Sequence, residues 1–183
     1  MRPRVILYLH GLASSPRGRK KAVLDARFSP EGYEVVAPDL NVPSFRELSF
    51  DEMHAEAVVA CAEANPRVVV GSSLGALVAL SLADTLGRTG APLVLIAPAF
   101  GFGERWASNL PDGESIEMFH HGEGRNLPIH RAFFEEMSAV TVDAAPPPVP
   151  VSVVMGTLDE TVPFAQVAAR WPGWEASGRL VPG

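Results

Sequence analysis

Three short segments of this chain carry residue types that together can perform acyl transfer. They are Gly71-Ser72-Ser73-Leu74-Gly75, His10-Gly11-Leu12 and Gly156-Thr157-Leu158-Asp159. They supply a serine, backbone donors for an oxyanion and a late carboxylate, in the order that a Ser…Asp…His hydrolase requires. Each segment follows a short apolar run, so the three are expected at one edge of a parallel sheet.

The central segment reads G-x-S-x-G between the apolar run 67–70 and the helix-prone stretch 76–83. A strand that turns abruptly into a helix at a serine is a nucleophile elbow, and Ser73 is the predicted nucleophile. Gly71 and Gly75 lack the Cβ atoms that would clash with the neighbouring strand and helix. The alternative is a glycine-rich turn without chemistry, because so short a pattern also occurs by chance.

The run 5–9 is typical of a strand buried on both faces, and it ends at His10-Gly11. We expect the N–H groups of Leu12 and Leu74 to form the oxyanion hole, in which each donor is worth about 2.7–4 kcal/mol. His10 and Gly11 are expected beside the substrate. His10 is predicted to brace its loop through hydrogen bonds rather than to move protons.

The run 149–155 is another buried-strand pattern, and Asp159 follows it. Asp159 is the predicted catalytic acid, which would fix the tautomer of a histidine. Two alternatives remain open. Asp159 caps the helix that opens at Pro163, although a cap would more naturally fall at Thr161, or Glu160 serves as the acid instead.

The stretch 8–18, YLHGLASSPRG, resembles the opening of the small α/β-hydrolase esterases of the YqiA-like group, and the resemblance continues through 71–75, Ala97-Pro98 and the Asp159 loop. It implies a carboxylic-ester or thioester hydrolase with Ser73 as nucleophile and Asp159 as acid. In that family the histidine of the triad follows the last strand of the sheet. Residues 179–183 resemble that last strand and the first residue of its loop. We therefore expect a truncated C-terminal end and no histidine in this chain that completes the triad, His121 being the first exception to test.

Strands and helices alternate along the chain, which predicts a mostly parallel sheet with helices on both faces. Strands are expected near 4–9, 34–37, 67–71, 92–97, 149–155 and 178–182, and helices near 17–27, 51–64, 74–87 and 163–171. The predicted architecture is an α/β-hydrolase fold in a single domain over 1–183, with a small helical cap insert at 99–140.

The insert is rich in aromatic residues, and Phe100, Trp106 and Phe119 are the candidates for an apolar wall of the substrate pocket. The alternative is that these aromatics form the core of an ordinary helical pair.

Composition excludes several function classes. A net charge of −6 without a basic stripe argues against nucleic acid, and the basic cluster 17–21 is interpreted as the solvated start of a helix. The apolar runs are too short to span a bilayer, and the first is too short for a signal peptide, so a cytoplasmic protein without a membrane partner is expected. Cys61 is predicted to be a buried helical thiol.

No cofactor or metal is expected. His120, His121, Glu123 and His130 lack the spacing of a known zinc motif. The predicted function is therefore a serine hydrolase that cleaves small carboxylic esters or thioesters through an acyl-enzyme on Ser73. The alternative is a catalytically defective hydrolase fold that serves as a binding module. The sequence specifies neither the acyl and leaving groups nor the oligomeric state.

Overall fold

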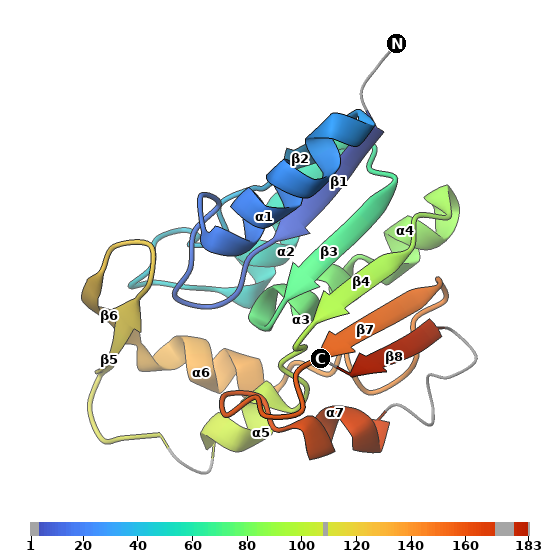
Figure 1. The fold of residues 1–183 in the computed structure, drawn as a ribbon. Coiled ribbons are helices and arrows are strands. Elements are labelled where there is room, and N and C mark those ends of the chain that lie inside the picture. Colours follow the sequence, from blue (N-terminus) through green and yellow to red (C-terminus); the bar gives the residue numbers. More distant parts are fainter. Residues whose placement is uncertain (1–3, 108–109, 171–177, 183) are drawn as a thin grey trace.

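Six parallel strands form the central sheet of the computed structural model, which describes residues 4–107, 110–170 and 178–182. The spatial order is β2-β1-β3-β4-β7-β8 (Figure 1). The strands are β1 (Arg4–Leu9), β2 (Tyr33–Val36), β3 (Val68–Ser72), β4 (Leu93–Ile96), β7 (Val151–Met155) and β8 (Gly178–Pro182). Because all six run parallel, the segments that follow β1, β3, β4 and β7 meet at one edge of the sheet.

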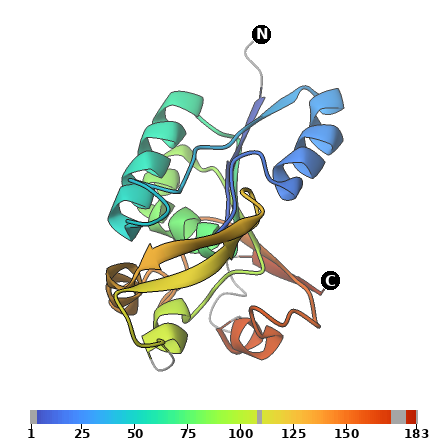
Figure 2. The same cartoon turned by 90° about the vertical axis from the view of Figure 1, so that its left-hand side faces the viewer.

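Helices connect these strands and lie on both faces of the sheet. They are α1 (Arg19–Phe28), α2 (Phe50–Ala64), α3 (Leu74–Ser81), α4 (Ala83–Thr89) and α7 (Phe164–Arg170), with a 3-10 turn at Ser29–Glu31. Seen along the sheet, α1 lies on one side and α2 and α3 lie on the other (Figure 2). The parallel sheet with helices on both faces, predicted from the alternation of elements, is confirmed.

Side-chain alternation in the strands divides the core into two clusters. Leu7, Leu9 and Val69 belong to the larger cluster, together with residues of α2 and α3. Ile6 and Tyr8 point to the other face and join a smaller cluster, against which Leu24 of α1 packs. Since both faces of β1 are covered, its near-continuous apolar sequence is explained.

The segment expected as a helical insert is only partly helical. It contains α5 (Phe102–Ala107) and α6 (Arg131–Ser138), and between them an antiparallel hairpin of β5 (Ser115–His120) and β6 (Arg125–His130). The strand signal is weak here, because β5 and β6 include histidine, glutamate, asparagine and proline. The turn uses Gly124 with φ 67° to reverse the chain.

The remaining elements match their predicted positions within a few residues, except that the helix expected over 74–87 is interrupted. It divides into α3 and α4 at Leu82, whose N–H donates to the Ala79 carbonyl three residues back. Among the described residues, no helix is both long and apolar enough to cross a membrane.

Candidate active site

Ser73 occupies a sharp turn between β3 and α3. Its backbone lies at φ 54° and ψ −117°, a region that non-glycine residues rarely adopt. A Cβ on Gly71 would lie 2.5 Å from the Gly75 carbonyl oxygen, and a Cβ on Gly75 would lie 2.2 Å from the Leu9 carbonyl oxygen. The two glycines are therefore required by close backbone approach, as the elbow pattern predicts, and the strained serine is of the kind found at functional sites.

The loop after β1 packs directly against this elbow. A Cβ on Gly11 would lie 3.2 Å from the Ser73 Cβ and 3.1 Å from the Ser72 carbonyl oxygen. Leu74 is the first residue of α3, so its N–H has no acceptor within the helix. The two backbone donors predicted for an oxyanion, those of Leu12 and Leu74, thus belong to segments that meet at Ser73.

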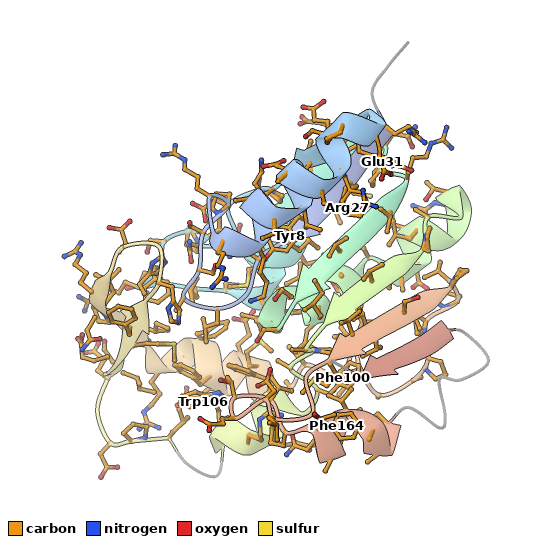
Figure 3. The ribbon with its side chains drawn as sticks, in the orientation of Figure 1. Tyr8, Arg27, Glu31, Phe100, Trp106 and Phe164 are labelled. Carbon is orange, nitrogen blue, oxygen red and sulfur yellow. The ribbon has the colours of Figure 1, made fainter. Side chains whose placement is uncertain are left out.

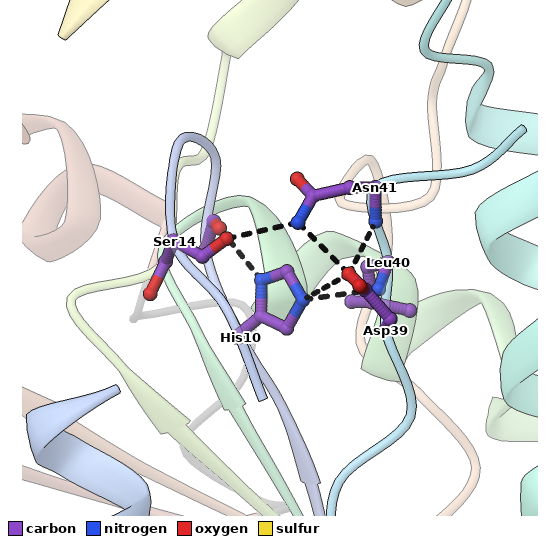
Figure 4. A network of polar contacts seen from close by, with 6 residues as sticks. His10, Ser14, Asp39, Leu40 and Asn41 are labelled. Carbon is purple, nitrogen blue, oxygen red and sulfur yellow. Dashed lines mark hydrogen bonds and ion pairs between the residues drawn. The ribbon is translucent and has the colours of Figure 1, made fainter. Parts of the chain in front are cut away.

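His10 is buried, with 2% of its surface exposed, and both ring nitrogens are engaged. The Leu40 N–H donates to Nε2 at 3.0 Å, so Nε2 is an acceptor, and Nδ1 lies 3.0 Å from the Gly11 carbonyl oxygen, to which it donates. Asp39 lies 3.4 Å from Nε2, and Asn41 donates to the same carboxylate oxygen (Figure 4). His10 therefore ties the β1 loop to residues 39–41, and its nitrogens are not directed at Ser73.

Asp159 lies in the loop between β7 and α7. Its Oδ1 accepts hydrogen bonds from the N–H groups of Thr161 and Val162, at 2.9 and 2.8 Å. These bonds close a turn that precedes α7, whose first residue is Phe164, so Asp159 does not cap the helix itself. Among the described residues Oδ2 has no hydrogen-bond partner, and this oxygen is left for another donor.

A cavity of about 860 Å³ joins these segments. It is lined by the serine and its elbow, the β1 loop, the acid loop and the tip of the hairpin, and its lining includes Ser73, Gly11, Leu12, Asp159 and His121. Four of the predicted site residues, Ser73, Gly11, Leu12 and Asp159, therefore border one space. His10 and Leu74, each 2% exposed, do not line it.

The hairpin tip closes one side of the cavity. The His121 N–H donates to the Ala13 carbonyl oxygen at 2.8 Å, and a Cβ on Gly122 would lie 3.0 Å from the Ser15 side chain. The exposed His121 ring packs edge-on against Phe119, with 5.4 Å between ring centroids. The tip is thus fixed on the loop that carries the predicted oxyanion donor.

The other histidines are engaged elsewhere. His54 bonds to Ser81 at 2.7 Å, His120 accepts from the Glu123 N–H at 3.1 Å, and His130 accepts from the Ala132 N–H at 3.2 Å. Burial lowers the pKa of His120, with the charge of nearby Glu123 acting in the opposite direction. Within the described residues, no histidine nitrogen is hydrogen-bonded to Ser73 or Asp159.

The aromatic residues predicted to face the substrate lie elsewhere. Phe100 is 1% exposed and belongs to the large core cluster, and Trp106 packs against Phe134 at 4.7 Å between centroids (Figure 3). Phe119 is half exposed on β5. None of the three lines the cavity, and for Phe100 and Trp106 the alternative interpretation as core residues is the better one.

Sequence reasoning missed several residues of the cavity. Tyr8 and Ser72, both almost fully buried, line it beside Ser73, and they share a hydrogen bond. Burial raises the pKa of Tyr8, and the bond to Ser72 opposes this. The basic residues Arg17 and Lys20 also line the cavity. The clue was their position, since they follow the predicted oxyanion loop by only a few residues.

Among the residues that the structure describes, no three histidine, cysteine, aspartate or glutamate side chains gather as metal ligands. The described cavity is bordered by a serine and a carboxylate, two of the groups that covalent acyl transfer uses.

Residues 5–176 match the model of the Uncharacterised protein family (UPF0227). The chain belongs to this family. A search of the curated proteins gave no significant match. Solved structures with the same fold are numerous, and three illustrate the range of proteins that share it.

A putative hydrolase from Agrobacterium vitis S4 has a TM-score of 0.79 at 22% identity, over 98% of this chain and 78% of that one. Est1E from Butyrivibrio proteoclasticus, solved with ferulic acid bound, has a TM-score of 0.79 at 17% identity, over 98% and 79%. Alpha/beta hydrolase domain-containing protein 10 from mouse has 0.78 at 19% identity, over 100% and 81%. At these identities the similarity shows that the UPF0227 chain has the α/β-hydrolase fold.

Proposed function

We propose that this UPF0227 protein is a serine hydrolase that cleaves carboxylic esters or thioesters of small acyl groups through an acyl-enzyme on Ser73. The observation that carries the proposal is the strained Ser73 elbow, which opens into the same cavity as Gly11, Leu12 and Asp159. The esterases among its structural neighbours make an ester substrate the first choice to test.

In the proposed reaction the Ser73 Oγ attacks the substrate carbonyl carbon and gives its proton to a histidine. The carbonyl π electrons move to the oxygen, and the resulting oxyanion accepts hydrogen bonds from the N–H groups of Leu12 and Leu74. Collapse of the tetrahedral intermediate expels the alcohol or thiol, which takes the proton from the histidine. Water then attacks the acyl-enzyme by the same route and releases the acid.

Asp159 would orient that histidine. Because two backbone N–H groups hold Oδ1, the carboxylate has a fixed direction before any imidazole binds to Oδ2. A preorganised carboxylate of this kind stabilises the imidazolium and selects its tautomer. His121 is the histidine in the described chain that borders the cavity, but no hydrogen bond joins it to Asp159 or Ser73.

Labelling with a fluorophosphonate, on a version of the protein in which a histidine completes the triad, tests the nucleophile. Peptide mass spectrometry should find the adduct on Ser73, and Ser73→Ala should abolish it. Ser72→Ala is the matched control, because Ser72 lines the same cavity but its hydroxyl is hydrogen-bonded to Tyr8. An adduct on Ser72, or hydrolysis of p-nitrophenyl butyrate that Ser73→Ala leaves unchanged, would refute the proposal. Absence of any adduct would favour the binding-module alternative.

A further inference from the structure

A group of positive side chains borders the cavity that contains Ser73. Residues 17–21 hold four of the fifteen lysines and arginines in a chain of net charge −6. Of these, Arg17, Arg19 and Lys20 line the cavity together with Ser73. The sequence alone suggested that this cluster is only the solvated start of a helix. In the structure it forms one wall of the candidate active site.

These three side chains are not neutralised by the protein. They are exposed, and none forms an ion pair or side-chain hydrogen bond with a described residue. Other cations on the same helix are paired, since Lys21 lies 2.6 Å from Asp25 and Arg27 bonds to Glu31 (Figure 3). The unpaired charges are thus those that face the cavity.

The cavity also contains three acids, but they are spread over other segments. Asp39 accepts from the backbone and side chain of Asn41, and Asp159 accepts from two backbone N–H groups. Glu123 lies on the hairpin turn. No described ion pair joins any of the three to the cations of residues 17–20, so the positive wall remains available to a ligand.

The loop that contains Arg17 and leads into α1 is firmly folded. The Gly18 N–H donates to the Ser15 carbonyl oxygen at 3.0 Å, and Asn41 donates to the Ser14 carbonyl oxygen at 3.0 Å. A Cβ on Gly18 would lie 3.2 Å from the Ser14 Oγ. Ser14 and Ser15 also line the cavity, and their hydroxyls have no described partner. Two hydroxyl donors next to guanidinium and ammonium groups favour an oxyanion.

We propose that Arg17 and Lys20 bind a carboxylate or phosphate group on the substrate, at a distance from the scissile ester. The protein would thereby select esters or thioesters that carry a second, negatively charged group. This inference rests on the proposed function for the identity of the reaction. The anion site itself is a binding site, and it can be tested without turnover.

The test uses non-hydrolysable analogues in pairs. Succinanilic acid carries a carboxylate that butyranilide lacks, and S-butyl-coenzyme A carries phosphates that S-butyl-N-acetylcysteamine lacks. Binding to the 183-residue protein is measured by calorimetry. At least one anionic analogue should bind on the order of tenfold more tightly than its neutral partner, as expected for about 1.4 kcal/mol of charge-assisted bonding. The difference should shrink as ionic strength rises.

The decisive variant is Arg17→Gln/Lys20→Gln, which should reduce the anionic preference to about twofold or less. The matched control is Lys21→Gln/Arg27→Gln, with the same change of net charge on two paired cations of the same region, and it should keep the preference. Which analogue responds identifies carboxylate or phosphate as the recognised group. The inference is overturned if neither anionic analogue is preferred, or if both double variants lose the preference equally.

These outcomes are separate from those of the serine test. A Ser73 adduct without anionic preference would refute only the anion site. Preference for an anion without any adduct would leave the anion site standing and refute the esterase proposal.

Discussion

Gly75→Ala is predicted to destabilise the protein through a clash at the base of the elbow. The new Cβ would lie 2.2 Å from the Leu9 carbonyl oxygen and 2.4 Å from the His10 carbonyl oxygen, both backbone atoms at the end of β1. Overpacking of this kind costs about 3 kcal/mol, whereas alanine gains up to about 1 kcal/mol over glycine in a helix. The net loss is about 2 kcal/mol, equivalent to a fall in Tm of roughly 4–8 °C at this chain length.

Gly87→Ala is the matched control, because it makes the same substitution in helix α4. There the added Cβ would meet only the Pro148 Cγ, at 3.9 Å, which is ordinary contact. The control should raise the free energy of unfolding by about 0.5–1 kcal/mol. Urea denaturation of both variants measures the two changes. If Gly75→Ala is as stable as the parent, α3 and β1 do not approach as closely as described, and the elbow geometry is wrong.

Three further predictions concern individual side chains. Asp159→Asn should keep the stability of the fold but lower kcat, on the order of 10⁴-fold where a histidine completes the triad. Asp159→Ala should also lose about 1 kcal/mol in urea denaturation, because the turn hydrogen bonds of Oδ1 are removed. His121→Ala should leave the residual p-nitrophenyl butyrate hydrolysis of this chain within about threefold of the parent rate, because oxyanion donors and binding alone sustain it. Full activity of the parent chain that this variant abolishes would contradict the expectation. Burial lowers the pKa of His120, so the unfolded chain binds more protons and stability should fall as pH drops below the ordinary value of 6.5; His120→Asn should flatten that dependence in pH-resolved urea denaturation.

The fold was largely predictable because its signals are local. Apolar runs such as 5–9 and 149–155 read as buried parallel strands, and both are found as β1 and β7. The roles of Gly71 and Gly75 were also readable, since a missing Cβ matters wherever backbones must cross. Features of this kind can be recognised from residue spacing alone, without knowledge of contacts between distant parts of the chain.

The site was less predictable because its walls come from segments whose contacts are not local. Phe100 and Phe119 have similar chemistry, yet one is buried in the core and the other is half exposed on a hairpin. Arg17 and Lys20 were interpreted as solvated charges, because their position beside Ser73 depends on the fold of the parallel sheet. The hairpin was missed because charged and turn-forming residues interrupt its strands.

The order of the strands has a consequence for the integrity of the candidate site. The elbow and the His10 loop follow two neighbouring strands, β3 and β1. The Asp159 carboxylate lies at the site only because β7 pairs with β4. Asp159 therefore depends on a strand pairing that involves neither the elbow strand β3 nor the His10 strand β1. Opening of the β4–β7 pairing would separate Asp159 from Ser73 while β1 and β3 remain paired.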